Sequence, residues 1–156
     1  MSRLIVCERT GRWAMAWRPW LTEGEIALHQ VRSLSQCRQA LDETPSAAVA
    51  LDAGSIASQG LLAAIADWTG HFPRAIVIVT APPNWLPDEF VLREAGALHV
   101  GYSPRTLGAA ATLVRRHLAN GARENSQPEA SAESLEQAIH RRLPWNRYAK
   151  ASGATS

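Results

Sequence analysis

The chain has 156 residues and a mass of 17.0 kDa, and 46% of its residues are apolar. This fits one ordinary domain with a hydrophobic core. No apolar run approaches the ~18–20 residues that a membrane span needs, and the first residues lack the pattern of a signal peptide. A net charge of +2 is too small to indicate nucleic-acid binding. We therefore expect a cytoplasmic protein that binds neither membranes nor nucleic acid.

Five short apolar runs alternate with segments of helical pattern along the first 120 residues. The runs predicted to be strands are residues 4–7, 25–31, 47–51, 75–79 and 97–102. The fourth, Ala75-Ile-Val-Ile-Val79, is typical of a strand buried on both faces. Strands that alternate with helices pair in parallel through right-handed crossovers. The sequence thus predicts an α/β fold, a doubly wound sheet of five parallel strands in flavodoxin-like order 2-1-3-4-5.

Five segments between and after these runs have the apolar spacing of helices. They are residues 11–21, 34–43, 58–69, 87–94 and 104–120. Ser33 is expected to cap the second helix at its N-terminus. Gly70 and Gly121 are expected to end the third and the fifth.

Tryptophan is frequent in the first helical segment, which holds Trp13, Trp17 and Trp20. The first two lie four residues apart and share a helix face, and we expect one or both of them to fill the core. Trp20, beside Pro19, is expected to be exposed and to mark an interface. Farther along, three prolines in residues 82–87 stiffen the loop around Trp85. This loop either presents Trp85 to a partner or leaves it buried on the fourth helix.

Residues after 120 differ in composition and form a C-terminal extension of the domain at 1–120. We expect a linker at 121–134, then a short amphipathic helix with the apolar stripe Leu135, Ile139 and Leu143, and a flexible end. The stripe is followed by Trp145. The extension either folds back onto its own domain or docks on a partner, with Trp145 as the anchor.

Polar residues follow the predicted strands at the edge where doubly wound sheets place their sites. They are Glu8, Asp52, Thr80 and Ser103. The surrounding segments are Leu4-Ile-Val-Cys-Glu8, Ala48-Val-Ala-Leu-Asp52, Val77-Ile-Val-Thr80-Ala81 and Ser103-Pro104, with Gly60 opening the third helix eight residues after Asp52. In this order and spacing, residues 3–120 resemble the receiver domain of bacterial two-component response regulators.

The resemblance implies a role for each of these positions. In that family an acidic pair ends strand one, an Asp that accepts the phosphoryl group ends strand three, a Thr or Ser ends strand four, and a Lys ends strand five. Here Cys7 and Glu8 stand at the acidic pair, and Ser103 replaces the lysine. Mg²⁺ prefers several oxygen ligands, which a thiol does not supply. Phosphoryl transfer also needs charge neutralisation, and the only lysine in the sequence is Lys150.

The four strand-end residues are therefore interpreted as a vestigial phosphoacceptor site without a catalytic role. Asp52 is expected to accept hydrogen bonds from nearby backbone N–H groups, and Thr80 to bond its own loop. No cofactor is expected. In the alternative in which Asp52 is phosphorylated, Glu8 and Asp52 would bind Mg²⁺.

The cysteines and histidines are not expected to form a functional site. Cys7 and Cys37 lie on different predicted elements and are expected to be buried apolar thiols. The five histidines show no metal-ligand spacing. We accordingly expect no metal or redox site.

The function predicted from these residues is that of a non-enzymatic pseudo-receiver, a protein-protein interaction module in signalling or regulation that acts independently of phosphorylation. The resemblance implies other proteins as partners, including a homodimer through helix 4, strand 5 and helix 5. The first alternative is a single-domain receiver that is phosphorylated on Asp52 with Mg²⁺. The second is a small-ligand sensor that uses the cleft at the strand ends.

Overall fold

The computed structural model describes residues 2–21 and 26–126. The strands are β1 (Ser2–Cys7), β2 (Ile26–Val31), β3 (Ala48–Asp52), β4 (Ile76–Thr80) and β5 (His99–Gly101). The α-helices are α1 (Arg12–Trp17), α2 (Leu34–Glu43), α3 (Ser58–His71), α4 (Glu89–Ala95) and α5 (Leu107–Ser126). Three short 3-10 helices are η1 (Arg18–Leu21), η2 (Pro83–Asp88) and η3 (Pro104–Thr106).

The strands form one parallel sheet in the order β2-β1-β3-β4-β5, which confirms the flavodoxin-like fold predicted from the sequence. β3 lies at the centre, and all five of its residues are buried. Because its neighbours on both sides run in the same direction, the carboxyl ends of the strands meet at one edge. Asp52 stands there directly beside Thr80 in the register of β3 and β4.

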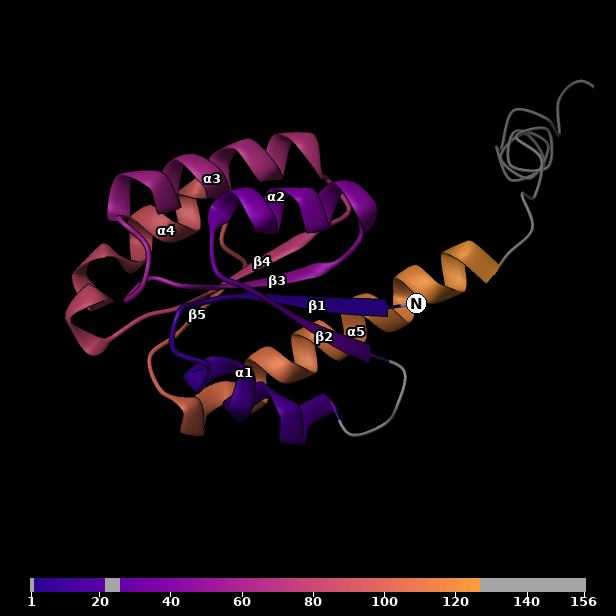
Figure 1. Cartoon of the computed structure of the whole chain (residues 1–156), viewed down its shortest axis with the longest axis horizontal. Coiled ribbons are helices and arrows are strands. Elements are labelled where there is room, and N and C mark those ends of the chain that lie inside the picture. The colour runs from indigo at the N-terminus through magenta and orange to yellow at the C-terminus, as the bar shows by residue number, and fades with distance from the viewer. Residues whose placement is uncertain (1, 22–25, 127–156) are drawn as a thin grey trace, which may run out of the picture. The chain divides into compact units, whose positions relative to one another are not determined.

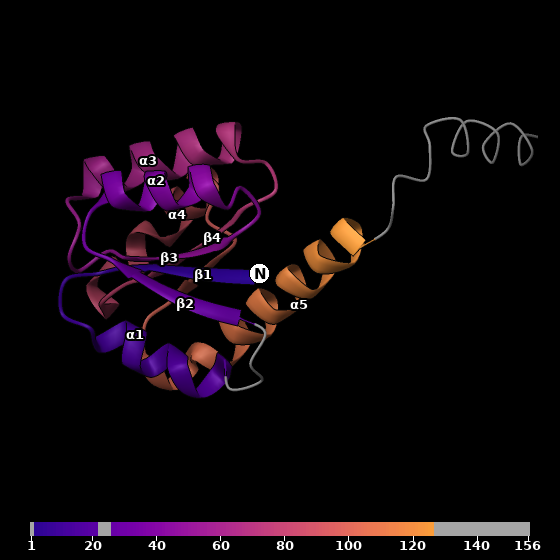
Figure 2. The ribbon, with the colours of Figure 1, turned by 45° about the vertical axis from the view of Figure 1, so that its right-hand side comes forward.

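Helices cover both faces of the sheet (Figures 1 and 2). One layer is formed by α2, α3 and α4, and the other by α1 and α5. Each layer closes a separate hydrophobic cluster against the sheet. Trp13 and Trp17 are both buried in the cluster beneath α1 and α5, which confirms that this helix face enters the core.

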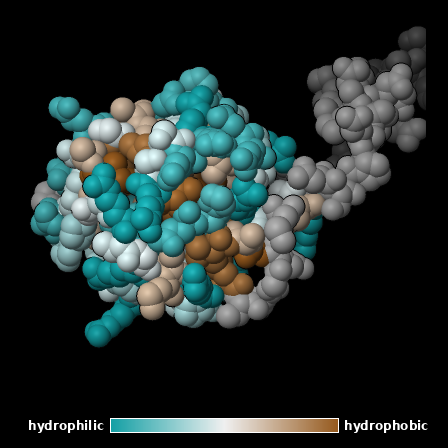
Figure 3. All heavy atoms as spheres, viewed as in Figure 1, coloured by the Kyte–Doolittle hydropathy of each residue, from teal (hydrophilic) through white to brown (hydrophobic). Residues whose placement is uncertain are grey.

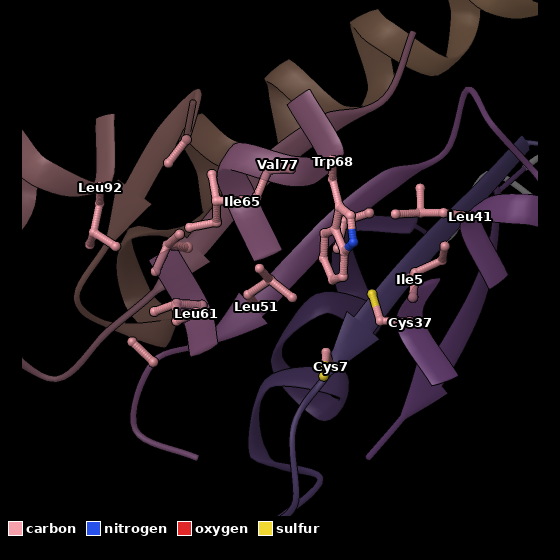
Figure 4. Close-up of a cluster of buried hydrophobic side chains, with 14 of the residues drawn as sticks. Ile5, Cys7, Cys37, Leu41, Leu51, Leu61, Ile65, Trp68, Val77 and Leu92 are labelled. Atoms are coloured by element: carbon pink, nitrogen blue, oxygen red, sulfur yellow. The ribbon is translucent and has the colours of Figure 1, made fainter. Parts of the chain in front are cut away.

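The cluster beneath α2 and α3 contains both cysteines (Figure 4). Cys7 lies at the end of β1 and Cys37 on α2, and both are buried free thiols, as predicted. Interaction with the Cys37 thiol lowers the pKa of Cys7, while the same interaction and burial raise the pKa of Cys37. Trp68 of α3 packs in the same cluster.

The predicted start of the second helix is confirmed, whereas the predicted ends of the third and fifth helices are wrong. Ser33 caps α2 by accepting a hydrogen bond from the Gln36 N–H at 3.2 Å, as predicted. Gly70 does not end α3, which continues to His71, and Gly121 does not end α5, which runs to Ser126. The linker expected from residue 121 therefore cannot begin before 127.

The predicted first and fourth helices are each divided. The first becomes 3-10 at η1, which contains Pro19, and the fourth is preceded by η2 through the proline-rich loop. Proline lacks an N–H and constrains its own φ, so it interrupts the α-helical hydrogen-bond pattern at both places.

The chain divides into two compact units, residues 1–122 and 123–156, and among the described residues the second contains only the end of α5. The predicted apolar stripe at Leu135, Ile139 and Leu143, and Trp145 after it, lie outside the described residues. None of the helices within the described ranges has the length and apolar character needed to cross a membrane.

Candidate functional site

A cleft of about 350 Å³ opens at the carboxyl ends of β3 and β4. Its walls come from the loops that follow β1, β3, β4 and β5. The residues that line it are Thr10, Arg12, Trp13, Asp52, Gly54, Ser55, Ala81, Pro82, Pro83 and Tyr102. Of the four predicted site residues, only Asp52 is among them.

Glu8 is not among the residues that line this cleft, and its side chain holds the start of α1. The residue is 1% exposed, and its carboxylate accepts hydrogen bonds from the backbone N–H groups of Trp13 at 2.9 Å and Ala14 at 2.6 Å. The Thr10 hydroxyl donates a third bond at 3.4 Å. The first N–H groups of a helix have no partner within the helix, so an acidic side chain at this place satisfies them. Glu8 therefore serves as the cap of α1.

Asp52 accepts hydrogen bonds from the loop that follows it. Oδ1 accepts from the Gly54 N–H at 3.0 Å, and Oδ2 accepts from the Ser55 hydroxyl. This matches the sequence interpretation of Asp52 as a carboxylate that bonds nearby backbone N–H groups. Only 8% of the residue is exposed, at the floor of the cleft. Both carboxylate oxygens are thus engaged within the loop.

The two hydroxyl residues also bond within the fold. Thr80 is buried and donates to the Leu51 carbonyl on β3 at 3.3 Å, so the prediction that it bonds its own loop is wrong. The reason is the parallel pairing, which places Thr80 beside the end of β3. Ser103 caps η3 by accepting from the Arg105 N–H at 3.2 Å.

The cleft contains groups that sequence reasoning did not single out. The Arg12 guanidinium lies 5.5 Å from the centre of the Trp13 ring and is the only cation among the lining residues described here. The Tyr102 hydroxyl donates to Glu89 at 2.8 Å. Burial, followed by this hydrogen bond, raises the pKa of Tyr102 to about 12. Arg12 and Tyr102 both follow the end of a strand, so the sequence predicts them only if the residues after each strand end are considered along with the terminal residue.

The other predicted interaction residues lie apart from the cleft. Trp20 is 37% exposed, as expected, and its ring rests against Gly108 of α5. Trp85 lies on η2, not on α4, and packs partly buried against the cluster beneath α2 and α3. The expected interface roles of these two tryptophans stay predictions.

The site does not have the donor set of a Mg²⁺ centre. Mg²⁺ takes near-octahedral oxygen ligands at short distances. At the acidic-pair positions, Cys7 points into the core and the Glu8 oxygens face the N–H groups of α1. In the described part of the chain, no group of three His, Cys, Asp or Glu residues is placed to hold a metal ion. The residues present therefore do not fit this ion.

Comparison with solved structures identifies the fold. A response regulator from Thermotoga maritima matches with a TM-score of 0.65 and 15% identity, covering 76% of this chain and 98% of its own. A CheY-like protein from Pseudomonas aeruginosa PAO1 matches with a TM-score of 0.59 and 13% identity, covering 75% of this chain and 99% of its own. The chain has the receiver fold.

A pilus assembly-related protein from Burkholderia pseudomallei K96243 shares this receiver fold, with a TM-score of 0.60 and 18% identity over 75% of this chain and 90% of its own. No known family's sequence profile matches the chain, and no curated protein does. The receiver fold therefore occurs in response regulators and in a protein related to pilus assembly, and at these identities the likeness concerns the fold alone.

Proposed function

We propose that this chain is a pseudo-receiver, a non-enzymatic module that acts by docking on other proteins and does not use phosphorylation. The observation that carries the proposal is the state of the strand-end groups. Glu8 caps α1, Asp52 bonds its own loop, and Thr80 bonds β3. Each polar group that the receiver reaction would use is engaged in holding the fold.

The missing lysine supports the same proposal. A phosphoryl group on Asp52 would carry its charge without the family's lysine, because the residue at that position is Ser103, which caps η3 and does not line the cleft. Arg12 is present, but its guanidinium lies over Trp13. A planar guanidinium fork does not substitute for an ammonium group at a fixed position. Formation of the phosphoryl state would then lack both its metal ion and its usual cation.

A docking surface is available on α4 and the loop before β5. Phe90 is 70% exposed, and Val91 and Leu98 are each 47% exposed. We call these three residues the α4 patch. The neighbouring charged residues pair with each other, with Arg93 Nη2 2.7 Å from Glu89 Oε1, so an uncharged partner surface would leave neither charge without a counter-ion. We propose that the α4 patch receives the apolar surface of another protein.

The phosphorylation half of the proposal is tested by incubating the full chain with Mg²⁺ and a small phosphodonor, then measuring its intact mass. A response regulator that phosphorylates itself from the same donor serves as the positive control. We expect no phosphoryl adduct on this chain. An adduct that disappears in Asp52→Asn would contradict the proposal and favour the phosphorylated alternative.

The docking half is tested by immobilising the full chain and comparing captured proteins between variants. We expect Asp52→Asn to capture the same protein as the unmodified chain, with or without the phosphodonor. Phe90→Glu, which places a charge in the α4 patch, should lose that protein. Capture that needs Asp52, or that ignores Phe90, would refute this half.

A further inference from the structure

The two edges of the sheet differ in length and regularity. β2 ends the sheet on one side and pairs with β1 over six consecutive positions, from Ser2 beside Ile26 to Cys7 beside Val31. Among the described residues, no strand pairs with the outer side of β2. At the other edge β5 has three residues. β2 is therefore the long edge of this sheet.

The backbone of β2 presents a regular row of groups at this edge. The Val31 carbonyl accepts a hydrogen bond from the Glu8 N–H, so the backbone of Val31 faces inward toward β1. Successive residues of a strand direct their N–H and C=O groups to opposite sides. Ile26, Leu28 and Gln30 therefore direct theirs outward, where another strand could pair with them.

Within its own six residues, β2 lacks the features by which natural edge strands avoid pairing. The means that lie in the strand itself are charged residues, proline, a bulge or a very short length. The sequence Ile-Ala-Leu-His-Gln-Val contains no proline and no acidic or permanently charged basic residue, and its pairing with β1 has no bulge. Ile26 and Leu28 are only partly buried, and apolar side chains reach the surface in this region of the molecule (Figure 3).

We propose that the free edge of β2 is a self-association surface. Two copies of this chain would pair their β2 strands antiparallel about a two-fold axis at Leu28, which joins two sheets into one. This surface differs from the helix 4, strand 5 and helix 5 face that the receiver resemblance implies for a homodimer. The proposal does not depend on the proposed function, and it leaves the α4 patch free for another protein.

The symmetry of the outward groups favours a second copy as the partner. In this register Leu28 lies opposite Leu28 of the other copy, and Ile26 lies opposite Gln30 at both ends. All three outward residues thus exchange N–H and C=O groups with an outward residue. No like charges meet across the axis, which would otherwise oppose pairing. An isologous two-fold contact of this kind closes on itself as a dimer.

The test measures the mass of the full chain by sedimentation equilibrium across the micromolar range, because one strand pair buries less area than a standard interface and binds weakly. We expect a concentration-dependent dimer. Gln30→Pro removes one outward N–H without touching the pairing with β1, and should give a monomer. The matched Gln30→Val keeps that N–H and should remain dimeric. Leu28→Lys sets two ammonium groups opposite each other and should also give a monomer.

Two controls separate this surface from others. Phe90→Glu should leave the dimer intact, and circular dichroism should show that each variant remains folded. In the proposed dimer, Ala27 of one copy would also lie opposite His29 of the other, as a non-hydrogen-bonded pair with Cα atoms about 4.5 Å apart.

The double variant Ala27→Cys with His29→Cys should therefore form disulfide-linked dimers under air oxidation. A chain that is monomeric throughout the range would overturn the proposal. A dimer that persists in both folded β2 variants, or one lost only in Phe90→Glu, would overturn it as well.

Discussion

Gly96 lies so close to Thr69 that a Cβ atom at position 96 would fall 2.2 Å from the Thr69 Oγ1. The contact joins the end of α4 to the last turn of α3, within the helix layer that holds the α4 patch. Gly96 also has a φ of 120°, a conformation that L side chains rarely adopt. Both steric factors require glycine at this position.

We expect Gly96→Ala to lower the free energy of unfolding by about 2–4 kcal/mol, because it adds overpacking to backbone strain. Urea denaturation measures this change. The matched control is Gly70→Ala, inside α3, where an added Cβ meets no atom within 4 Å. Gly70→Ala should stabilise the fold by ~0.5–1 kcal/mol. Equal effects at the two positions would contradict the packing described for Gly96.

Removal of the Glu8 carboxylate should lower the free energy of unfolding more than removal of an ordinary surface carboxylate does. Glu8→Ala leaves the buried N–H groups of Trp13 and Ala14 without an acceptor, and we expect a loss of about 2–4 kcal/mol in the free energy of unfolding. Glu8→Gln keeps one acceptor oxygen and should lose less. Glu43→Ala breaks only the exposed pair with Arg3 and should change stability by less than ~1 kcal/mol.

The comparison is made by urea denaturation with and without Mg²⁺. If Glu8 were a metal ligand, Mg²⁺ would stabilise the unmodified chain and the stabilisation would vanish in the variants. We expect no effect of Mg²⁺ on any of them.

The raised pKa of Tyr102 predicts a loss of stability in strong base. The fold keeps this phenol protonated to about pH 12, whereas in the unfolded chain it ionises near its ordinary value of 10.0. The contribution of the raised Tyr102 pKa to the stability of the fold is therefore complete below pH 10, and it is lost as the pH rises from 10 toward 12. Between pH 9 and pH 11, Tyr102→Phe should lose less stability than the unmodified chain. An identical loss in both would show that Tyr102 titrates normally.

Trp145 is expected to anchor association, although it lies outside the described residues. We predict that Trp145→Ala leaves the folding of residues 1–120 unchanged. It should weaken self-association or partner capture by roughly 30-fold, which is ~2 kcal/mol of binding. Because α5 extends to Ser126, truncation to remove the whole extension should follow residue 126 rather than 120. A Trp145→Ala chain that melts much earlier but associates normally would assign this residue a structural role.

The sheet could be predicted from the sequence because its signals are local and repeated. Five apolar runs separated by helical patterns leave few topologies open, and Ser33 marked the start of α2 correctly. The helix ends were less predictable. Glycine ends a helix when its left-handed conformation is used, and α3 and α5 instead continue through Gly70 and Gly121.

The contacts of the candidate site were only partly predictable. The Asp52 bonds follow from its own loop, two and three residues away, so local reasoning found them. Thr80 bonds Leu51, 29 residues earlier, and that partner is fixed by the pairing of two strands. Glu8 matches the family position by residue type, but the backbone after β1 directs its carboxylate to α1.

The internal bonding of the strand-end groups bears on how such a domain could carry information. Glu8, Asp52 and Thr80 each have a partner within the domain, so modification of this edge would first have to break bonds that support the fold. If the chain acts as the proposed pseudo-receiver, the signal that a partner reads would be the number of copies present. Synthesis and turnover of the protein would then set the response, in the place of a kinase and a phosphatase.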